Sequence, residues 1–465
     1  MQTACRRGKI GRAKGDILLE YSNLLFASVI LPLSALALFF DRSAEYKNLI
    51  LIVTSALFLL WGRPLLAGLV LLSWIVDFLL ALGIEKLPRS KALLLGADIL
   101  WNGAVFMLYM KPWLTGHLIK EAFILPCIAF YTLKNFSYVF DVFSGRCRAE
   151  HNPFCLMTYS VAYPFLLAGP VVRYGDIEPQ IRKRSFDTSL FSDGLCSYAA
   201  GLGKTVIILP VLTGLTDITL RADELTRGGA WLGTAAFIAS AYVGFSGAAD
   251  MGAGIARING FDVKDNYQPI SCGSMAGSLV KSCNTTMIEL FDDIRSFSGR
   301  KAVSLVMTVI LGGAAGLFYG GGRIGVLMGA LVGAWLAAEY LIGYEKIKAV
   351  PWVFRAVGAL VVCLLIAAAL AFKTPDDCRA WFSALLGRGV SEGFGKGVGG
   401  YLMHNIFVII VALVYISPLR TLAAAAAKKI SEKNEKNYAA VQRLKTALLA
   451  AVMMISYLLL AAGKL

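Results

Sequence analysis

The sequence predicts an all-α protein that crosses a membrane many times, and three observations support this fold class. Hydrophobic residues make up 57% of the 465 positions and charged residues only 16%, whereas a soluble protein carries about a quarter charged residues. Apolar runs of about 20 residues, the length of a membrane-crossing helix, recur along the whole chain. The basic residues, which give a net charge of +15, lie mainly between these runs. We therefore expect one polytopic membrane domain over residues 1–465.

The composition also argues against several classes of function. The basic excess does not indicate nucleic-acid binding, because anionic headgroups and the positive-inside bias explain basic loops in membrane proteins. The nine cysteines include no Cys-x-x-Cys pair, so we expect small buried residues rather than a disulfide framework. Cys147, His151 and Cys155 have a spacing that suggests metal ligands. Pro153 interrupts any helix that would align them, and a tetrahedral set is incomplete, so we expect no metal site.

The chain begins with a basic arm over residues 1–16, which has no cleavage-type pattern. We expect this arm to be cytosolic rather than part of a secretory signal peptide. Apolar segments follow, and because some are short or interrupted we expect about 11 crossings plus re-entrant pieces. They lie at roughly 22–40, 48–61, 64–84, 92–110, 121–143, 154–172, 196–220, 229–247, 302–320, 323–344, 351–372, 400–418 and 446–462.

Three polar stretches interrupt this apolar pattern. Residues 173–195 and 248–300 are too polar to span a membrane, and such middle segments line a cavity or lie along the interface. Residues 427–445 are predicted to be a charged loop or a surface helix. No internal repeat is evident, which counts against many secondary transporters.

Residues 310–335 are apolar and rich in glycine. Small residues let helices approach closely in lipid, and a glycine-rich break is tolerated there only beside protein or a water-filled cavity. We therefore expect this stretch to lie inside the protein, next to a cavity.

Four blocks of sequence carry a resemblance to a known family. The second, Leu125–Val142, is similar to the family pattern P-x-G-I-S-F-Y-T-F-Q-x-x-S-Y-x-x-D-V, and the third, Pro164–Tyr174, to P-x-x-I-A-G-P-I-x-R-Y. The first is Ser28–Gly62, and the fourth runs from Phe245 to Tyr267. In this order they resemble the membrane-bound O-acyltransferase (MBOAT) family, in its bacterial branch of alginate O-acetylation and lipoteichoic-acid D-alanylation proteins. The resemblance covers about residues 18–386.

The resemblance implies a helical bundle of the MBOAT type, with re-entrant segments and a central chamber walled by residues 245–345. It implies an acyl donor, acyl-CoA or a carrier-linked thioester, rather than a tightly bound cofactor. It also implies a hydroxylated extracytoplasmic acceptor, either a polysaccharide or a teichoic acid. Membrane lipids and the proteins of an envelope acylation system are the expected partners, and the bacterial cytoplasmic membrane is the expected location.

The family's chemistry rests on two positions. Its polar residue, in a motif like R-R-W-H-I-S-L, corresponds to Asn284 by ungapped counting from Asn266. Its membrane-buried histidine, in G-L-W-H-G, corresponds to Tyr319 within Gly316–Gly320. A second family histidine corresponds to Val332. Both imidazoles are therefore missing at the positions where the resemblance places them.

This replacement changes the chemistry that the site can perform. Histidine suits general base catalysis because its pKa lies near working pH. A tyrosine has a pKa of about 10, which burial raises, so it donates a hydrogen bond to a carbonyl oxygen but is a poor base. His404, at the start of an apolar run, is a candidate for a relocated base in the chamber, or else an interface residue.

Four further residues are candidates for substrate contacts. Asp250 and Asp141 are carboxylates within apolar surroundings, where such groups mark a cavity or an ion pair. Arg173 is a possible partner, so a fold-holding ion pair and a substrate contact both stay open. Tyr131 lies within the second block.

Three functions follow from these residues. The first is an O-acyltransferase relative that acts on a hydroxylated cell-envelope polysaccharide or similar acceptor, with Tyr319 and Asn284 in an altered centre. The second is a catalytically silent membrane protein that binds a lipid, an acyl group or a partner. The third is a transporter or scaffold that uses the same chamber.

Overall fold

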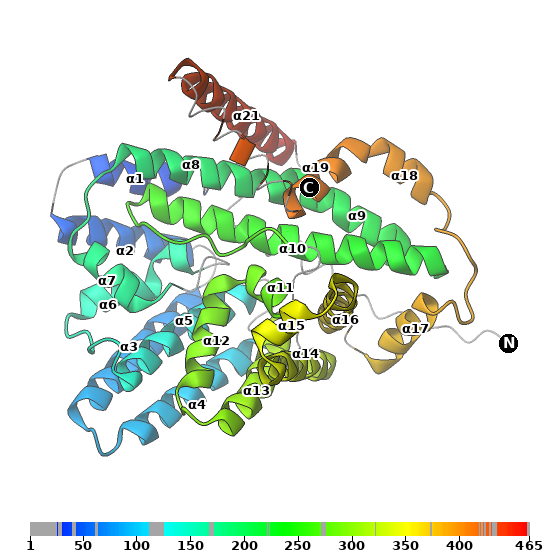
Figure 1. Cartoon of the computed structure of the whole chain (residues 1–465). Helices are drawn as coiled ribbons and strands as arrows, with labels where there is room; N and C mark the ends of the chain where they lie inside the picture. The colour runs from blue at the N-terminus through cyan, green and yellow to red at the C-terminus, as the bar shows by residue number, and fades with distance from the viewer. Residues whose placement is uncertain are drawn as a thin grey trace.

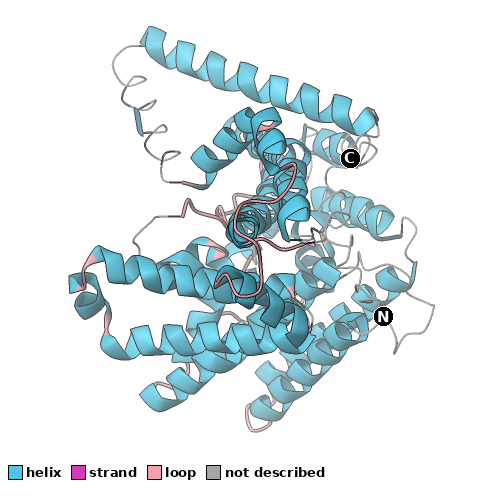
Figure 2. Ribbon diagram, turned by 90° about the vertical axis from the view of Figure 1, so that its right-hand side faces the viewer, coloured by secondary structure: helices cyan, strands magenta, loops and turns pink. Residues whose placement is uncertain are grey.

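The computed structural model describes residues 26, 30–39, 43–60, 64–110, 125–166, 172–220, 222, 224–270, 276–320, 322–372, 374–417, 419, 422, 425–426, 429 and 435–462. Helices make up most of this described part, and it contains no strand (Figures 1 and 2). The predicted basic arm, residues 1–16, lies outside it.

The helices follow one another with short connections. The first half of the chain contains α1 (Leu31–Phe39), α2 (Ala44–Leu60), α3 (Pro64–Lys86), α4 (Lys91–Met110), α5 (Leu125–Ser144), α6 (Pro153–Val161), η5 (Tyr163–Phe165), α7 (Tyr174–Arg182), α8 (Thr188–Gly203), the π-helical η6 (Lys204–Ile208) and α9 (Leu209–Leu220). The second half contains α10 (Arg227–Ile258), α11 (Ala276–Ser282), α12 (Thr285–Ser296), α13 (Lys301–Gly320), α14 (Gly322–Ile342), α15 (Tyr344–Ala349), α16 (Trp352–Ala371), α17 (Pro375–Leu385), α18 (Val398–His404), α19 (Ile406–Ile416) and α21 (Glu435–Ala461).

The longest helix, α10, lies at the centre of the arrangement. It begins where the Thr226 hydroxyl accepts a hydrogen bond from the Gly229 N–H at 3.1 Å, an N-cap that satisfies one of the free donors of the first turn. The continuous run of α8, η6 and α9 packs along it on one side. In Figure 1 the helices α3–α5 and α12–α14 lie on the other side.

The length and apolar composition of its helices identify this chain as a multi-pass integral membrane protein, as predicted. Seven helices of the described part are long and apolar enough to cross a membrane, or up to eight if the bent pair α18 and α19 forms one span. That pair turns by 77° at His404–Asn405, which fits the predicted re-entrant pieces. The expected number of about 11 crossings is not reached within the described residues, where the predicted segment 154–172 begins with α6, a helix of only nine residues.

The glycine-rich stretch forms a close hairpin of α13 and α14. A Cβ atom on Gly316 would lie 2.0 Å from the Gly325 carbonyl oxygen, and one on Gly329 would lie 2.4 Å from that of Gly312. Only glycine permits this approach of two backbones. The positive φ of 70° at Gly322 allows the tight turn into α14.

One prediction about a particular segment needs correction. Residues 310–335 do not contain a break within a span: α13 and α14 are continuous up to the turn between them, and their outer faces are exposed. Helical hydrogen bonding continues through the glycines because the partner helix supplies the packing that they lack. Residues 435–445, predicted as part of a charged loop or a surface helix, form the first turns of α21.

Buried polar side chains join α3, α4 and α5. The Asn102 amide donates to Asp77 at 3.1 Å and to Asp98 at 3.1 Å, and the Asn135 amide donates to the other Asp77 oxygen at 2.9 Å. All four side chains are at least nine-tenths buried. The three helices are therefore held together by polar contacts as well as by apolar packing.

Candidate functional site

Asn284 is placed by the beginning of α12. Its side-chain oxygen accepts a hydrogen bond from the Met287 N–H at 3.2 Å, which makes it the N-cap of the helix. The buried Asn266 satisfies two further donors of the same turn: its carbonyl accepts from Thr285 N at 3.0 Å and its side chain from Thr286 N at 3.1 Å. These contacts leave the Asn284 amide nitrogen free to point away from the helix.

That amide donates a hydrogen bond to the hydroxyl oxygen of Tyr319. Tyr319 lies near the end of α13, and its ring packs edge-on against Phe245 at 5.2 Å and Phe318 at 5.0 Å between centroids. Tyr267, in the segment after α10, is a second hydrogen-bonding neighbour of its hydroxyl. The two positions that the family resemblance singled out therefore contact each other.

Both residues line one cavity of about 610 Å³. Its walls come from α10, α11, α12, α13, α14 and α16. Val332, the position of the second family histidine, also lines it. The expected wall of residues 245–345 supplies most of the lining, and Ile238 and Leu370 extend it at either end of that range. As expected, the glycine-rich hairpin borders this cavity, through Gly312, Gly316 and Gly329.

No histidine is among the described residues that line the cavity. Glu339 accepts hydrogen bonds from the N–H groups of Ala276 at 3.2 Å and Gly277 at 2.9 Å, and Asp292 pairs with Arg295 at 2.9 Å. Burial raises the pKa of the Cys283 thiol to about 12, so this side chain is a protonated, weak nucleophile at neutral pH. Asn284 and Tyr319 are thus neutral hydrogen-bond donors in a largely apolar lining, which also contains the charged Lys281, Asp292, Arg295 and Glu339.

The relocated-base prediction for His404 is not supported by its position. His404 is exposed at the C-terminal end of α18 and is not among the described residues that line the cavity. The bend between α18 and α19 carries the imidazole to the surface, which corresponds to the interface alternative.

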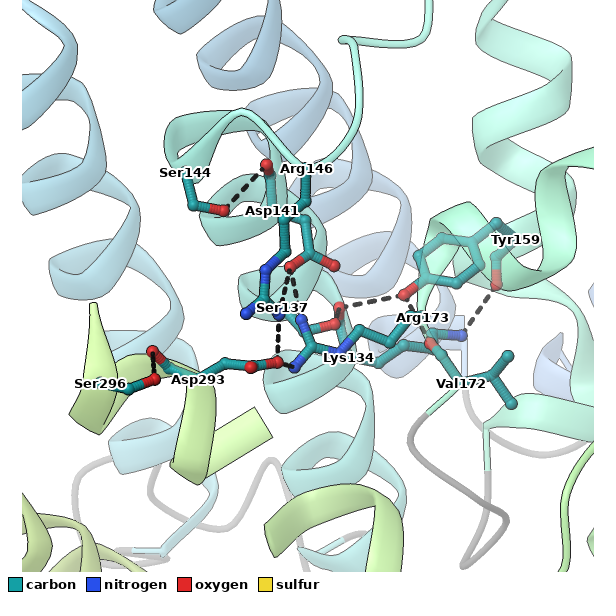
Figure 3. A network of polar contacts seen from close by, with 10 residues as sticks. All are labelled: Lys134, Ser137, Asp141, Ser144, Arg146, Tyr159, Val172, Arg173, Asp293 and Ser296. Carbon is teal, nitrogen blue, oxygen red and sulfur yellow. Dashed lines mark hydrogen bonds and ion pairs between the residues drawn. The ribbon is translucent and has the colours of Figure 1, made fainter. Parts of the chain in front are cut away.

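Asp141 and Arg173 form an ion pair with each other (Figure 3). Arg173 also pairs with Asp293 of α12, and Arg146 pairs with Asp293 and lies 4.0 Å from Asp141. The hydrogen bond from Arg146, together with the Arg173 guanidinium, holds the pKa of the Asp293 carboxyl below its usual range. The two predicted substrate contacts are engaged in a network that joins α5, the start of α7 and α12.

Asp250 and Tyr131 are also engaged within the fold. Asp250 of α10 pairs with Lys204 at the start of η6, and the Lys204 ammonium lies 4.0 Å from the centre of the Tyr415 ring. The fully buried Tyr131 donates its hydroxyl hydrogen to the Val70 carbonyl at 2.8 Å. Neither residue lines the cavity. The sequence did not show this, because a motif match does not reveal which way a helical side chain faces.

In the described part of the chain, no group of three or more ligand-type side chains could hold a metal ion. His151, from the suggested ligand set, instead lies 3.2 Å from Glu85.

Sequence reasoning did not select several residues that build this site. Asn266, Tyr267 and Phe245 lie inside the fourth block, and the polar and aromatic types within that block were the available signal. Asp293 carries no such signal, because a charged residue in a polar stretch is ordinarily a solvated one.

No family model matches the chain. The chain is similar over most of its length to curated bacterial proteins named probable alginate O-acetylase AlgI. The protein of Pseudomonas aeruginosa is 27% identical over 459 residues, which cover 89% of this chain and 85% of the relative. That of Pseudomonas putida is 28% identical, covering 72% and 74%, and that of Pseudomonas fluorescens is 29% identical, covering 72% and 70%. The resemblance to the alginate O-acetylation branch is thereby confirmed.

Proposed function

We propose that this chain, which is similar to proteins named probable alginate O-acetylase, holds an acyl thioester in its cavity and serves the O-acylation of a hydroxylated envelope polysaccharide. The donor class is acyl-CoA or a carrier-linked thioester. In this proposal the Tyr319 hydroxyl binds the carbonyl oxygen of the acyl group, and the Asn284 amide supports that hydroxyl.

The contact between Asn284 and Tyr319 supports this proposal most directly. Since the amide donates to the phenol oxygen, the phenol hydrogen is directed to another acceptor. A carbonyl oxygen in the cavity can accept that hydrogen. Hydrogen bonds in a chain polarise one another, so the amide strengthens the phenol as a donor.

Such a donor performs one part of acyl transfer. It draws electrons from the carbonyl carbon and stabilises the negative charge that develops on oxygen when a hydroxyl attacks. The oxygen of the acceptor then forms the new ester bond, the thioester C–S bond breaks, and the hydroxyl proton passes to the departing thiolate. A positioned base accelerates this proton transfer about 100- to 10,000-fold.

The cavity lining also favours a second function, that of a silent acyl-binding relative. No imidazole is present in the described lining, and the two family-histidine positions are occupied by Tyr319 and Val332. A neutral phenol supplies binding without fast proton transfer. Under this alternative the chain retains the acyl group for a partner of the acylation system.

The experiment compares two ligands that differ only in the carbonyl. Octanoyl-coenzyme A and the thioether S-octyl-coenzyme A are titrated into the full-length protein in lipid nanodiscs. We expect octanoyl-coenzyme A to bind about fivefold more tightly, the value of one net neutral hydrogen bond of about 1 kcal/mol. Tyr319→Phe removes this preference and leaves the thioether affinity unchanged.

Tyr340→Phe is the matched control, because it deletes another phenol from the cavity lining, beside Arg295 and on a different helix. It keeps the preference for the thioester. A preference that survives in Tyr319→Phe would overturn the proposed carbonyl contact. Release of free coenzyme A in the presence of an acceptor polysaccharide then distinguishes the enzyme from the silent binding protein.

A further inference from the structure

Helix α12 forms one wall of the cavity and presents its opposite side to α5. Met287, Ile288, Phe291, Asp292 and Arg295 line the cavity, a spacing that corresponds to one helical face. On the opposite side the fully buried Leu290 packs with Phe130 and Phe140 of α5. The helix is thus a separate wall whose position sets the distance across the cavity.

Apolar packing alone does not determine how such a helix is rotated or shifted along its axis. Burial of apolar surface is non-directional, and the contacts of Leu290 with aromatic rings tolerate small rotations. Ionised hydrogen bonds to guanidinium groups have a defined geometry. On α12 that geometry is supplied by Asp293, which pairs with both Arg146 and Arg173 (Figure 3).

Arg173 is itself held rigidly. Its guanidinium pairs with the buried Asp141 of α5. The carbonyl of the preceding Val172 accepts a hydrogen bond from the buried Tyr159 hydroxyl at 2.8 Å. The Lys134 ammonium in turn donates to the Tyr159 carbonyl at 2.8 Å. Asp293 therefore binds to a fixed point of the bundle rather than to a mobile surface side chain.

We propose that Asp293 is a positioning residue: by pairing with Arg146 and Arg173, it fixes α12 so that the Asn284 amide reaches the Tyr319 hydroxyl. Asn284 lies nine residues before Asp293, about 13.5 Å along the helix axis. Asp293 touches neither the cavity nor Tyr319 and acts only through the helix. This inference rests on the proposed binding of an acyl carbonyl at Tyr319.

Asp293→Asn is the suitable variant, because it leaves no buried charge without a partner. Arg173 keeps Asp141, and Arg146 is 45% exposed. Removal of Arg173 would instead leave Asp141, which is 5% exposed, without its closest cation, and such changes are strongly destabilising. The Asp293 variant therefore tests position rather than folding.

The test is a double-mutant cycle with octanoyl-coenzyme A and S-octyl-coenzyme A as probes. In the wild-type background Asp293→Asn weakens binding of the thioester, by up to the about fivefold effect of one hydrogen bond, and leaves the thioether unaffected. In the Tyr319→Phe background it has no further effect on either probe. Independent sites so far apart are additive, so this loss of effect identifies action through Tyr319.

The controls separate this inference from a general loss of structure. Asp293→Glu restores part of the thioester preference, because it keeps the charge. Asp376→Asn removes an acidic partner from an exposed pair, Asp376 with Arg379, and changes neither affinity. If Asp293→Asn does not yield folded protein, Arg146→Gln replaces it in the cycle. We expect this variant to weaken thioester binding in the same way, but by a smaller factor.

Three outcomes decide the matter. If Asp293→Asn weakens both probes equally, or weakens the thioester as much in Tyr319→Phe as in the wild type, Asp293 has a structural role and the inference is overturned. If Tyr319→Phe abolishes the preference but Asp293→Asn keeps it, the inference fails and the proposed function stands. If Tyr319→Phe itself keeps the preference, the proposed function fails.

Discussion

The hydroxyl of Tyr319 lies where the family resemblance places an imidazole, and its hydrogen-bonding neighbours are the Asn284 amide and Tyr267. These neighbours would also suit a histidine, because an amide can hydrogen-bond to a ring nitrogen as well as to a phenol. What the site lacks is a group that accepts a proton near neutral pH. The described lining contains neighbours that could hold a histidine in place, but no histidine.

Tyr319→His supplies that group. We expect thioester cleavage in the presence of a hydroxylated acceptor to rise by about 100-fold or more, since a positioned base contributes at least that factor. Release of coenzyme A from octanoyl-coenzyme A measures the rate. Tyr340→His, which adds an imidazole to the cavity beside Arg295, should leave the rate unchanged. An equal rise in both variants would contradict the assignment of the centre to residue 319.

At the scale of helices, the contact of α13 with α14 depends on particular glycines. Gly316 faces the Gly325 carbonyl so closely that a methyl group would lie 2.0 Å from it, whereas a methyl group on Gly313 meets its nearest neighbour at an ordinary 3.6 Å. A backbone carbonyl cannot turn aside as a flexible side chain can. The two glycines, three residues apart in one helix, therefore have different tolerances.

Gly316→Ala should separate the two helices and lower the free energy of unfolding by about 1–3 kcal/mol, the usual cost of overpacking. Gly313→Ala should be neutral or slightly stabilising, because alanine has the higher helix propensity. Thermal unfolding in nanodiscs compares them. Equal melting temperatures for the two variants would show that the hairpin is looser than the structure indicates.

The ion network between α12 and α5 predicts a dependence of stability on pH. The pKa of Asp293 is lowered by Arg146 and Arg173, so the ionised carboxyl stabilises the folded state above the ordinary aspartate value of about 4. This contribution is lost as the pH falls through the lowered value. Melting temperatures measured from about pH 6 downward should therefore fall less in Asp293→Asn than in the wild type. Parallel curves would mean that the pairs contribute no stability.

On the scale of the whole molecule, the cavity joins helices from distant parts of the chain. Its walls run from α10 to α16 and enclose about 610 Å³, a size typical of sites for drug-sized ligands. A ligand that fills it binds the folded arrangement and not the unfolded chain. Binding should therefore stabilise both sides of the cavity together.

Octanoyl-coenzyme A at 100 times its dissociation constant should raise the free energy of unfolding by about 2.7 kcal/mol. The increase appears as a higher melting temperature in nanodiscs that follows the ligand concentration. Free coenzyme A, which lacks the acyl chain, serves as the control and should have a smaller effect. A melting temperature that does not change with the concentration of octanoyl-coenzyme A would contradict acyl binding in the folded protein.

Much of this architecture was predictable from the sequence. Apolar length and the family blocks identified the membrane bundle. Ungapped counting selected Asn284 and a motif match selected Tyr319, and both line one cavity. The ion pair of Asp141 with Arg173 was one of the two alternatives left open. Side-chain direction was not predictable, because Tyr131 and Asp250 match motif positions yet contact other helices. Asp293 and Arg146 come together across 147 positions of sequence, and no local pattern encodes such a pairing.

The polar cluster of Asp77, Asp98 and Asn102 has a consequence for how the protein enters its membrane. An aspartate near the middle of a lone helix costs about 2.5–3.5 kcal/mol on insertion. Within α4 the Asn102 amide donates to Asp98, but it reaches Asp77 only when α3 and α4 lie side by side. We therefore expect the two helices to enter the membrane as a pair, and their short connection at residues 87–90 keeps each within reach of the other during synthesis.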